Sequence, residues 1–384
     1  MPTISSRMER IPDSPISEMA HLASRYDVIN LAQGFPDFDP PAELIAAAVA
    51  ALQSGHNQYA LTCGSHRFRQ ALANKQSRFT GLEIDPDHIT VTCGGTEAMM
   101  STMHTVCNPG DRVIIFSPFY ENYAPDALLC GATPVYVSLD PPDFALDGDE
   151  LRKAFQQGAK ALVLCNPANP SGKVFSLEEL QIIASLAQEY DAFVLMDEVY
   201  EHIVYAPHHH TYLAALPGMF ERTITCGSLS KTYSITGWRL GYTIASPAVT
   251  QSIRKVHDYM TVGAPAPLQE AAVTALTLPD AYYNQLQADY TRRRNLFISC
   301  LEQAGLPYLC PQGGCFVLAD ISNLGFNDDR SFCLWLAKEI GVTGVPCSSF
   351  FNRPVRHLVR FNFAKRDETL LQAGERLCKI KEKL

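Results

Sequence analysis

The stretch Ser228-Leu229-Ser230-Lys231-Thr232-Tyr233, followed by Thr236-Gly237-Trp238-Arg239-Leu240-Gly241-Tyr242, decides how the rest of this chain is interpreted. It places one lysine, two serines and one arginine close together, between two apolar stretches. A buried lysine amine beside an arginine that grips phosphate is what a protein needs to hold pyridoxal phosphate as a Schiff base. The string alone could equally be a solvated loop, so the other segments have to decide.

Size and composition narrow the class of protein. A chain of 384 residues that is 47% hydrophobic can bury a large core, and its length predicts two or three domains. The net charge is −9 and no basic block is present, so nucleic acid is not an expected partner. Residues 1–15 do not resemble a secretory signal, and no apolar run reaches the roughly 18–20 residues that span a bilayer.

The cysteines and histidines suggest neither disulfides nor metal. Twelve cysteines are scattered without CxxC pairs, which favours reduced thiols, a cytoplasmic protein and no metal site. We expect His208-His209-His210 to be a solvent-exposed loop, and His257, within a helical pattern, to be a satisfied structural histidine.

Strand-like and helix-like patterns alternate through the middle of the chain. Short apolar, β-branched runs are separated by amphipathic segments such as 96–106 and 177–190. This alternation predicts an α/β fold with a mostly parallel sheet that is covered by helices on both faces. The expected strands are 89–92, 112–117, 161–165, 193–197 and 223–226.

Polar residues follow these strands where a ligand site is expected. Ligands bind at the carboxyl ends of the strands in such sheets. The residues that fall just after a predicted strand are Gly95 and Thr96, Tyr120, Asn169, Asp197 and Lys231.

The pattern of apolar and charged residues changes near residue 276. A charged helix over 281–305 precedes strand candidates at 313–320 and 358–363. We therefore expect a large domain over 41–275, a smaller α+β domain over 276–384, and an N-terminal segment, 1–40, that packs with the small domain.

Three polar residues suit a pyridine ring. Asp197 follows a wholly apolar strand, where a carboxylate needs a cationic partner such as a protonated ring nitrogen, or else caps the next helix. Asn169, held extended by Pro170, and Tyr200 could both hydrogen-bond the phenolic oxygen of the cofactor. A plain turn is the alternative for the loop that contains Asn169.

A phosphate seat and a ring-stacking residue complete the candidate cofactor site. The backbone N–H groups of Gly95 and Thr96 open a predicted helix and can bind an anion. Ser228 and Arg239 supply further donors, and the guanidinium can grip phosphate with two bonds. Tyr120 offers a flat ring for stacking, although aromatic residues are more often simple packing residues.

Arg360 ends a strand between apolar neighbours. A guanidinium in that setting either pairs with a structural carboxylate or receives the α-carboxylate of a substrate. In the second case, closure of the small domain would deliver it to the site.

Taken together, these residues resemble the class I/II aminotransferases, the fold type I enzymes that use pyridoxal phosphate. Segments in the same order carry the resemblance nearly from end to end: 31–38 (LAQGFPDF), 57–59 (NQY), 217–223 (PGMFERT) and 359–361 (VRF). The branch that these segments resemble contains kynurenine–oxoglutarate transaminase, glutamine transaminase K and bacterial methionine aminotransferases.

The resemblance implies a role for each matching residue. Lys231 would be the Schiff-base lysine and proton shuttle, Asp197 would pair with the ring nitrogen, and Asn169 and Tyr200 would bind the phenolic oxygen. Phosphate would be held by Gly95, Thr96, Ser228 and Arg239. The remaining roles are stacking for Tyr120, binding of the α-carboxylate for Arg360 with Gly34 and Asn169, and contact with the phosphate of the neighbouring subunit of a homodimer for Tyr59.

Two departures from the branch concern the pocket. Relatives that act on kynurenine carry an aromatic residue and a histidine where this chain has Val262 and Gly263. The stretch Leu164-Cys165-Asn166-Pro167 also replaces the usual Asn-Thr-Pro, although Asn169 is kept. The preferred side chain of the substrate therefore stays open.

The expected activity is transamination between a methionine-like, glutamine-like or aromatic L-amino acid and a 2-oxo acid, by ping-pong kinetics. A carbon–sulfur β-lyase that acts on cystathionine or cysteine S-conjugates is the first alternative, and the Trp238-Arg239 pair argues against it. A non-catalytic regulator that senses pyridoxal phosphate is the second alternative, and the acidic balance of the chain argues against its DNA-binding module.

Overall fold

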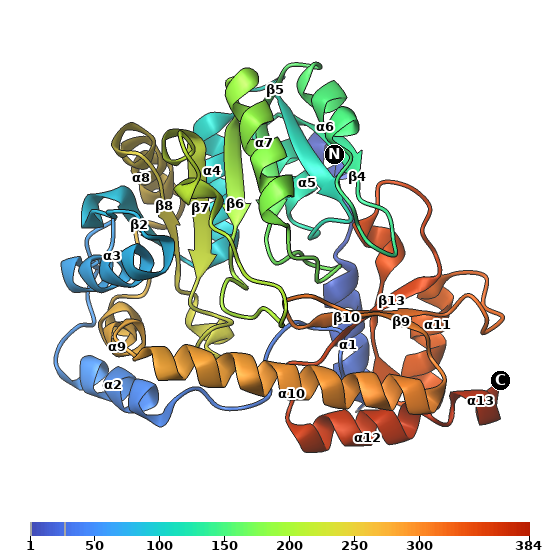
Figure 1. Ribbon diagram of the computed structural model, residues 1–384. Coiled ribbons are helices and arrows are strands. Elements are labelled where there is room, and N and C mark those ends of the chain that lie inside the picture. Colours follow the sequence, from blue (N-terminus) through green and yellow to red (C-terminus); the bar gives the residue numbers. More distant parts are fainter. Residues whose placement is uncertain (1, 27) are drawn as a thin grey trace.

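The computed structural model describes residues 2–26 and 28–384. Within them, a central seven-stranded sheet has the order β2-β8-β7-β6-β5-β3-β4 (Figure 1). All neighbours are parallel except β8, which is antiparallel to both β2 and β7. The strands are β2 (Ile89–Thr92), β3 (Arg112–Ser117), β4 (Thr133–Ser138), β5 (Ala159–Cys165), β6 (Phe193–Asp197), β7 (Thr223–Ser228) and β8 (Gly241–Ile244).

Helices cover both faces of this sheet because alternate side chains of its strands point to opposite sides. Val113 and Ile115 of β3 pack in one buried cluster with α4 (Gly95–Val106), α5 (Tyr123–Leu129) and α8 (Pro247–Thr261). Ile114 and Phe116 pack in another, with α6 (Gly148–Phe155) and α7 (Leu177–Glu189). The expected α/β architecture, a mostly parallel sheet between helices, is confirmed.

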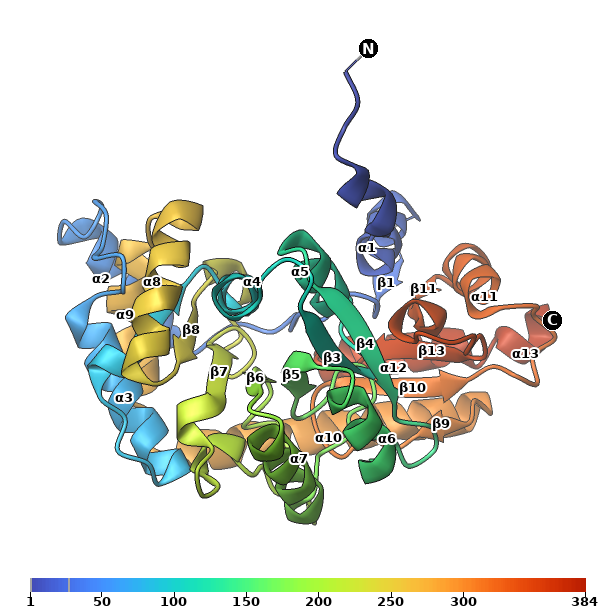
Figure 2. The same cartoon turned by 90° about the horizontal axis from the view of Figure 1, so that it is seen from above.

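A third apolar cluster lies at the β2 end of the sheet. It joins β2 and β8 to α2 (Ala42–Gln53), α3 (His66–Thr80) and α9 (Ala266–Leu276). In Figure 2 these helices and α8 lie at one end of the molecule, and α11 and the C-terminus lie at the other.

The C-terminal part forms a smaller unit around an antiparallel sheet of order β12-β13-β10-β9. Its strands are β9 (Tyr308–Leu309), β10 (Phe316–Asp320), β12 (Val345–Pro346) and β13 (Leu358–Asn362), and its helices are α11 (Asp329–Trp335), α12 (Asp367–Leu377) and α13 (Ile380–Lys383). The N-terminal segment joins this unit: α1 (Pro15–Tyr26) precedes β1 (Ile29–Asn30), which pairs in parallel with β11 (Val342–Thr343).

The long helix α10 (Asp280–Ala304) runs along both units (Figure 1). One end of α10 lies near α9 and the helix then runs along α12, so a single helix packs against both units. The division at residues 40 and 275 stays a prediction.

Most predicted elements appear within two residues of their expected bounds. The clearest difference is β10, expected from residue 313 but beginning at Phe316. Gly314 has a left-handed φ of +72°, and Gly313 makes an isolated bridge to Val204. The chain therefore turns at these glycines before it extends. None of the helices in 2–26 and 28–384 has the length and apolar character needed to cross a membrane.

Candidate active site

One cavity of about 530 Å³ gathers the predicted site residues. Its wall includes every one of them except Tyr59: Gly34, Gly95, Thr96, Tyr120, Asn169, Asp197, Tyr200, Ser228, Lys231, Arg239 and Arg360. The parallel strands explain this convergence. Asp197 ends β6, Ser228 ends β7, and Gly95 opens the helix after β2, so the carboxyl ends of neighbouring strands present these residues to one space.

Lys231 is the partly buried amine of this cavity. Its Nζ donates a hydrogen bond to the carbonyl oxygen of Gly34, which belongs to the N-terminal segment. Burial lowers the pKa of Lys231 below the usual value for lysine. A lowered pKa increases the share of neutral amine, the form that attacks an aldehyde.

Asp197 is a partly buried carboxylate with two donors. Its Oδ2 accepts a 2.5 Å hydrogen bond from the phenol of Tyr123, and its Oδ1 accepts one of 3.2 Å from the backbone N–H of Val199. Burial raises the pKa of Asp197, although the Tyr123 hydrogen bond opposes that effect. No helix follows Asp197 directly, so the alternative of a helix cap is wrong.

Tyr123 was not singled out from the sequence. It lies on α5, 74 positions from Asp197, and only the packing of α5 on the sheet brings the two together.

The anion seat combines the backbone N–H groups of Gly95 and Thr96 with the side chains of Ser228 and Arg239. Gly94 has a φ of +83° and is the N-cap of α4, and no side chain caps the N–H groups that follow it. A Cβ on Gly94 would lie 2.3 Å from Nη2 of Arg239, so glycine lets the guanidinium approach the helix end. Arg239 donates to the carbonyl oxygens of Thr236 and Cys93, at 3.0 and 3.4 Å.

Arg360 is only 1% exposed, and its contacts are with neutral groups. It donates to Oδ1 of Asn169 at 2.8 Å and to the carbonyl oxygen of Ala32 at 3.1 Å, and its guanidinium lies 4.1 Å over the ring of Phe316. It forms no ion pair with any carboxylate of the described residues, so the alternative of a structural pair is wrong. Asn169 holds Arg360 and thus does more than complete a turn.

Two acidic residues of the wall were also missed. Glu121 accepts a 2.7 Å hydrogen bond from Ser14, and burial raises its pKa. Asp126 is 3% exposed, and burial raises its pKa to about 8. Their sequence neighbourhood, 120–126, contains no pattern that separates them from ordinary loop and helix acids.

Tyr59 lies outside the cavity and is 87% exposed. Three other large hydrophobic residues are exposed as well. Leu61, two positions after Tyr59, is 64% exposed, and Tyr259 and Met260, near the end of α8, are 93% and 43% exposed. The role of Tyr59 in a neighbouring subunit stays a prediction.

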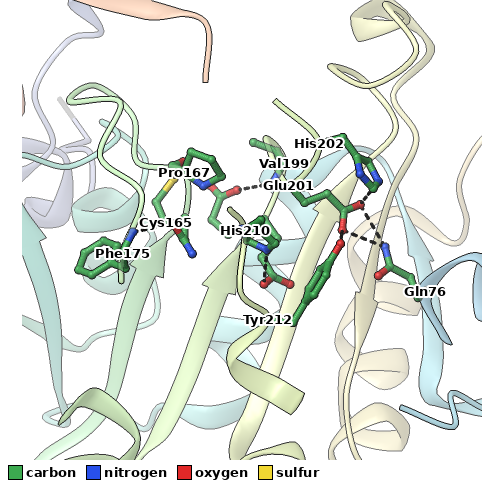
Figure 3. Close-up of polar contacts among 12 residues, drawn as sticks. Gln76, Cys165, Pro167, Phe175, Val199, Glu201, His202, His210 and Tyr212 are labelled. Carbon is green, nitrogen blue, oxygen red and sulfur yellow. Dashed lines mark hydrogen bonds and ion pairs between the residues drawn. The ribbon is translucent and has the colours of Figure 1, made fainter. Parts of the chain in front are cut away.

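A buried polar network is centred on Glu201, and Figure 3 draws it with Gln76, His202 and Tyr212. Glu201 accepts hydrogen bonds from Lys75, Gln76 and Tyr212 at 2.7, 3.1 and 2.8 Å. The side chain of His210 is 5% exposed and lies 3.2 Å from Glu198. The expectation that residues 208–210 are all solvent-exposed is therefore wrong for His210, because the loop folds back onto the sheet.

His257 is fully buried and its Nδ1 lies 2.5 Å from Oε1 of Glu97, but its Nε2 has no hydrogen-bond partner among the described residues. The expectation of a satisfied structural histidine is therefore met at one ring nitrogen only. Within 2–26 and 28–384, no group of three or more His, Cys, Asp or Glu side chains is arranged to hold a metal ion.

Comparisons with known proteins agree with this geometry. The family described as aminotransferase class I and II matches residues 26–377. Methionine aminotransferase of Escherichia coli is 36% identical over 374 residues, 97% of each chain. Human kynurenine–oxoglutarate transaminase 1 is 37% identical over 414 aligned positions, 98% of each chain.

Solved structures show the same similarity in three dimensions. The N-succinyldiaminopimelate aminotransferase of Mycobacterium tuberculosis superposes with a TM-score of 0.96 at 37% identity, over 98% of this chain and 100% of that one. These relatives share the fold type I architecture and are aminotransferases, and nothing in them favours the β-lyase alternative. The chain therefore belongs to the class I and II aminotransferase family, and transamination is its activity.

Proposed function

We propose that this aminotransferase uses pyridoxal phosphate to move the amino group of an L-amino acid with an uncharged apolar, sulfur-containing, glutamine-like or aromatic side chain to a 2-oxo acid. The observation that carries the proposal is the meeting of Lys231, Asp197 and Arg360 in one cavity. These supply a partly buried amine, a partly buried carboxylate and a buried guanidinium that has no carboxylate partner among the described residues.

The cavity fits the cofactor at its two polar ends. The first turn of α4 with Ser228 and Arg239 forms an anion seat at one end. The space beside Gly94 in this seat would be filled by the Cβ of any other residue. Asp197 lies in the same cavity as a partner for a protonated ring nitrogen. When bound, pyridoxal phosphate supplies an electron sink for the α-carbon of the substrate.

The side chains of this chain supply binding and proton transfer. Nζ of Lys231 would move the proton that leaves the α-carbon of the amino acid. Arg360, held by Asn169, would bind the α-carboxylate with its planar fork. Tyr200 and Asn169 would hydrogen-bond the phenolic oxygen of the cofactor, and Tyr120 would stack on its ring.

The charges of the cavity support an uncharged substrate side chain. Its cationic residues are Lys231, Arg239 and Arg360, and each already has a role. Glu121 and Asp126 add acidic groups to the wall, and Ile16, Met99 and Phe316 add apolar ones. A substrate with a second carboxylate therefore finds no spare cation on the described part of this chain. This argues against aspartate and N-succinyldiaminopimelate as donors, although some relatives are named for them.

The proposal includes a homodimer in the cytoplasm. Tyr59 can serve a phosphate only if another subunit brings its site to this exposed residue. The exposed apolar residues of α2, Ile45, Val49 and Leu52, give a second copy an apolar surface to cover. All twelve cysteines are thiols, which suits a reducing compartment.

A half-reaction screen tests the proposal. The protein loaded with pyridoxal phosphate is mixed with single amino acids, and loss of the cofactor absorbance band is followed. Methionine, glutamine or an aromatic amino acid should bleach the band quickly, and aspartate should do so slowly. Lys231→Ala should abolish the reaction. Lys160→Ala should not, because Lys160 lies at the start of β5 and does not line the cavity. A chain that never acquires the cofactor band would refute the proposal.

A further inference from the structure

The first turn of α4 carries an unusual acidic residue. Glu97 is the third residue of the helix whose N–H groups form the anion seat, and it is 7% exposed. A carboxylate in this position normally bonds to the N–H groups at its own helix end. Here its Oε2 accepts from the N–H of Cys93, just before the N-cap, and among the described residues no side chain accepts from the N–H groups of Gly95 and Thr96.

Glu97 contacts three polar groups, one in the turn just before α4 and two in the distant helix α8. Its Oε2 accepts from the backbone N–H of Cys93 at 2.5 Å. Its Oε1 lies 2.5 Å from Nδ1 of His257 and accepts from Oγ1 of Thr261 at 2.9 Å. Both of these residues belong to α8, so the carboxylate ties the turn before α4 to the end of α8.

The hydrogen bonds to Glu97 favour its charged form. Burial opposes ionisation, but the hydrogen bonds from His257 and Cys93 together outweigh burial and lower the pKa of Glu97. Hydrogen bonds to a charged group contribute more than those between neutral groups.

Cys93 carries this restraint to the phosphate-binding arginine. Its N–H is held by Glu97, and its carbonyl oxygen accepts from Nη2 of Arg239 at 3.4 Å. Its thiol also donates to the carbonyl oxygen of Gly263, just beyond α8, at 3.7 Å. Every polar group of Cys93 is thus engaged, and the peptide that precedes Gly94 has little freedom to turn.

We infer that Glu97 is a positioning residue for the phosphate group of the cofactor. With His257 and Thr261 it fixes Cys93, and through Cys93 it fixes both the N-terminal turn of α4 and Arg239. This inference rests on the proposed use of pyridoxal phosphate. It concerns the affinity for phosphate and not the chemical step.

The competing effect of Glu97 has the opposite sign. Its negative charge lies in the same helix turn as the expected phosphate and would repel it. If repulsion were the main effect, any neutral residue at 97 would strengthen phosphate binding. If positioning is the main effect, a variant whose neutral residue 97 keeps the hydrogen bond to Cys93 should bind phosphate nearly as well as the parent. A variant whose residue 97 cannot form that bond should bind phosphate more weakly.

The test compares pyridoxal phosphate with pyridoxal, which lacks the phosphate. The dissociation constant of each is measured by absorbance titration of the cofactor-free full-length protein, and their ratio isolates the contribution of the phosphate seat. We expect Glu97→Met to reduce the preference for pyridoxal phosphate about tenfold or more, and Glu97→Gln, which can still accept from Cys93, to change it less than about threefold. Thr261→Val, which removes a single donor, should reduce it about two- to fivefold and remains available if Glu97→Met does not fold.

Asp329→Asn is the matched control. Asp329 is also buried and also accepts from a backbone N–H, that of Ser348 at 2.6 Å, but it lies on α11 of the smaller unit. It should lower the melting temperature and leave the ratio unchanged. An unchanged or increased preference in Glu97→Met, or in Thr261→Val where Glu97→Met does not fold, would overturn the inference. A parent protein that binds neither compound would instead refute the proposed function itself.

Discussion

The phenol of Tyr123 donates a 2.5 Å hydrogen bond to Oδ2 of Asp197, and this bond joins the first turn of α5 to the end of β6. Asp197 is partly buried, and burial alone would favour its protonated form. Tyr123 is therefore the side chain that favours the charged form, which a protonated ring nitrogen requires as its partner.

Tyr123→Phe should lower the rate of the amino acid half-reaction about 10- to 100-fold, because a hydrogen bond to a charged group is worth about 1.5–3 kcal/mol. Rapid mixing with methionine measures this rate. Tyr136→Phe is the control, since Tyr136 lies in the same apolar cluster and stacks on Phe119. Equal rates in the Tyr123 variant and the parent would show that Asp197 does not need this donor.

Arg360→Lys should weaken the recognition of the α-carboxylate. The lysine keeps the positive charge but loses the planar fork that Asn169 and the carbonyl of Ala32 hold in place. We expect KM for methionine to rise about tenfold or more, and we expect the half-reaction with 3-(methylthio)propylamine, which has no carboxylate, to change little. A similar loss for both compounds would contradict a carboxylate role for Arg360.

Gly94→Ala should cost more free energy of pyridoxal phosphate binding than free energy of unfolding. Its Cβ would lie 2.3 Å from Nη2 of Arg239, so the guanidinium would have to leave the helix end. Gly110→Ala is a matched control, because Gly110 has a similar φ of +94° but open space around its Cβ. Both glycines have a positive φ that other residues rarely adopt, so both variants should lose about 1–3 kcal/mol of unfolding free energy. Only Gly94→Ala should lose cofactor affinity in an absorbance titration.

The sequence predicts the parts of the site that follow directly from strand ends. Asp197, Ser228 and Lys231 are visible because each breaks an apolar run, and Gly95 and Thr96 because glycine precedes a helical pattern. Their meeting in one cavity then follows from the parallel sheet.

Contacts between distant segments could not be predicted in this way. Tyr123 reaches Asp197 across 74 positions and His257 reaches Glu97 across 160, and nothing local distinguishes these residues from packing residues. The strand order has the same limitation. Buried apolar strands look alike in sequence, so the insertion of antiparallel β8 between β2 and β7 becomes known only from the structure.

Asp126 offers a prediction for stability against pH. Burial raises its pKa from the usual 3.8 to about 8, so the folded chain holds a proton there that the unfolded chain releases above about pH 4. Such a group stabilises the fold below the unfolded pKa, and that contribution is lost as the pH rises through about 8.

Asp126→Asn cannot ionise, so its melting temperature relative to the parent should increase steadily from pH 5 to pH 8 and then level off. Each pH unit between the two pKa values corresponds to at most about 1.4 kcal/mol. Thermal unfolding of both proteins across this range measures the difference, and the exposed Asp143→Asn should show no such slope. A difference that does not change with pH would mean that Asp126 ionises in the fold as readily as in the unfolded chain. The acidic wall would then carry a full negative charge at neutral pH, and its discrimination against a second substrate carboxylate would be stronger than a protonated Asp126 allows.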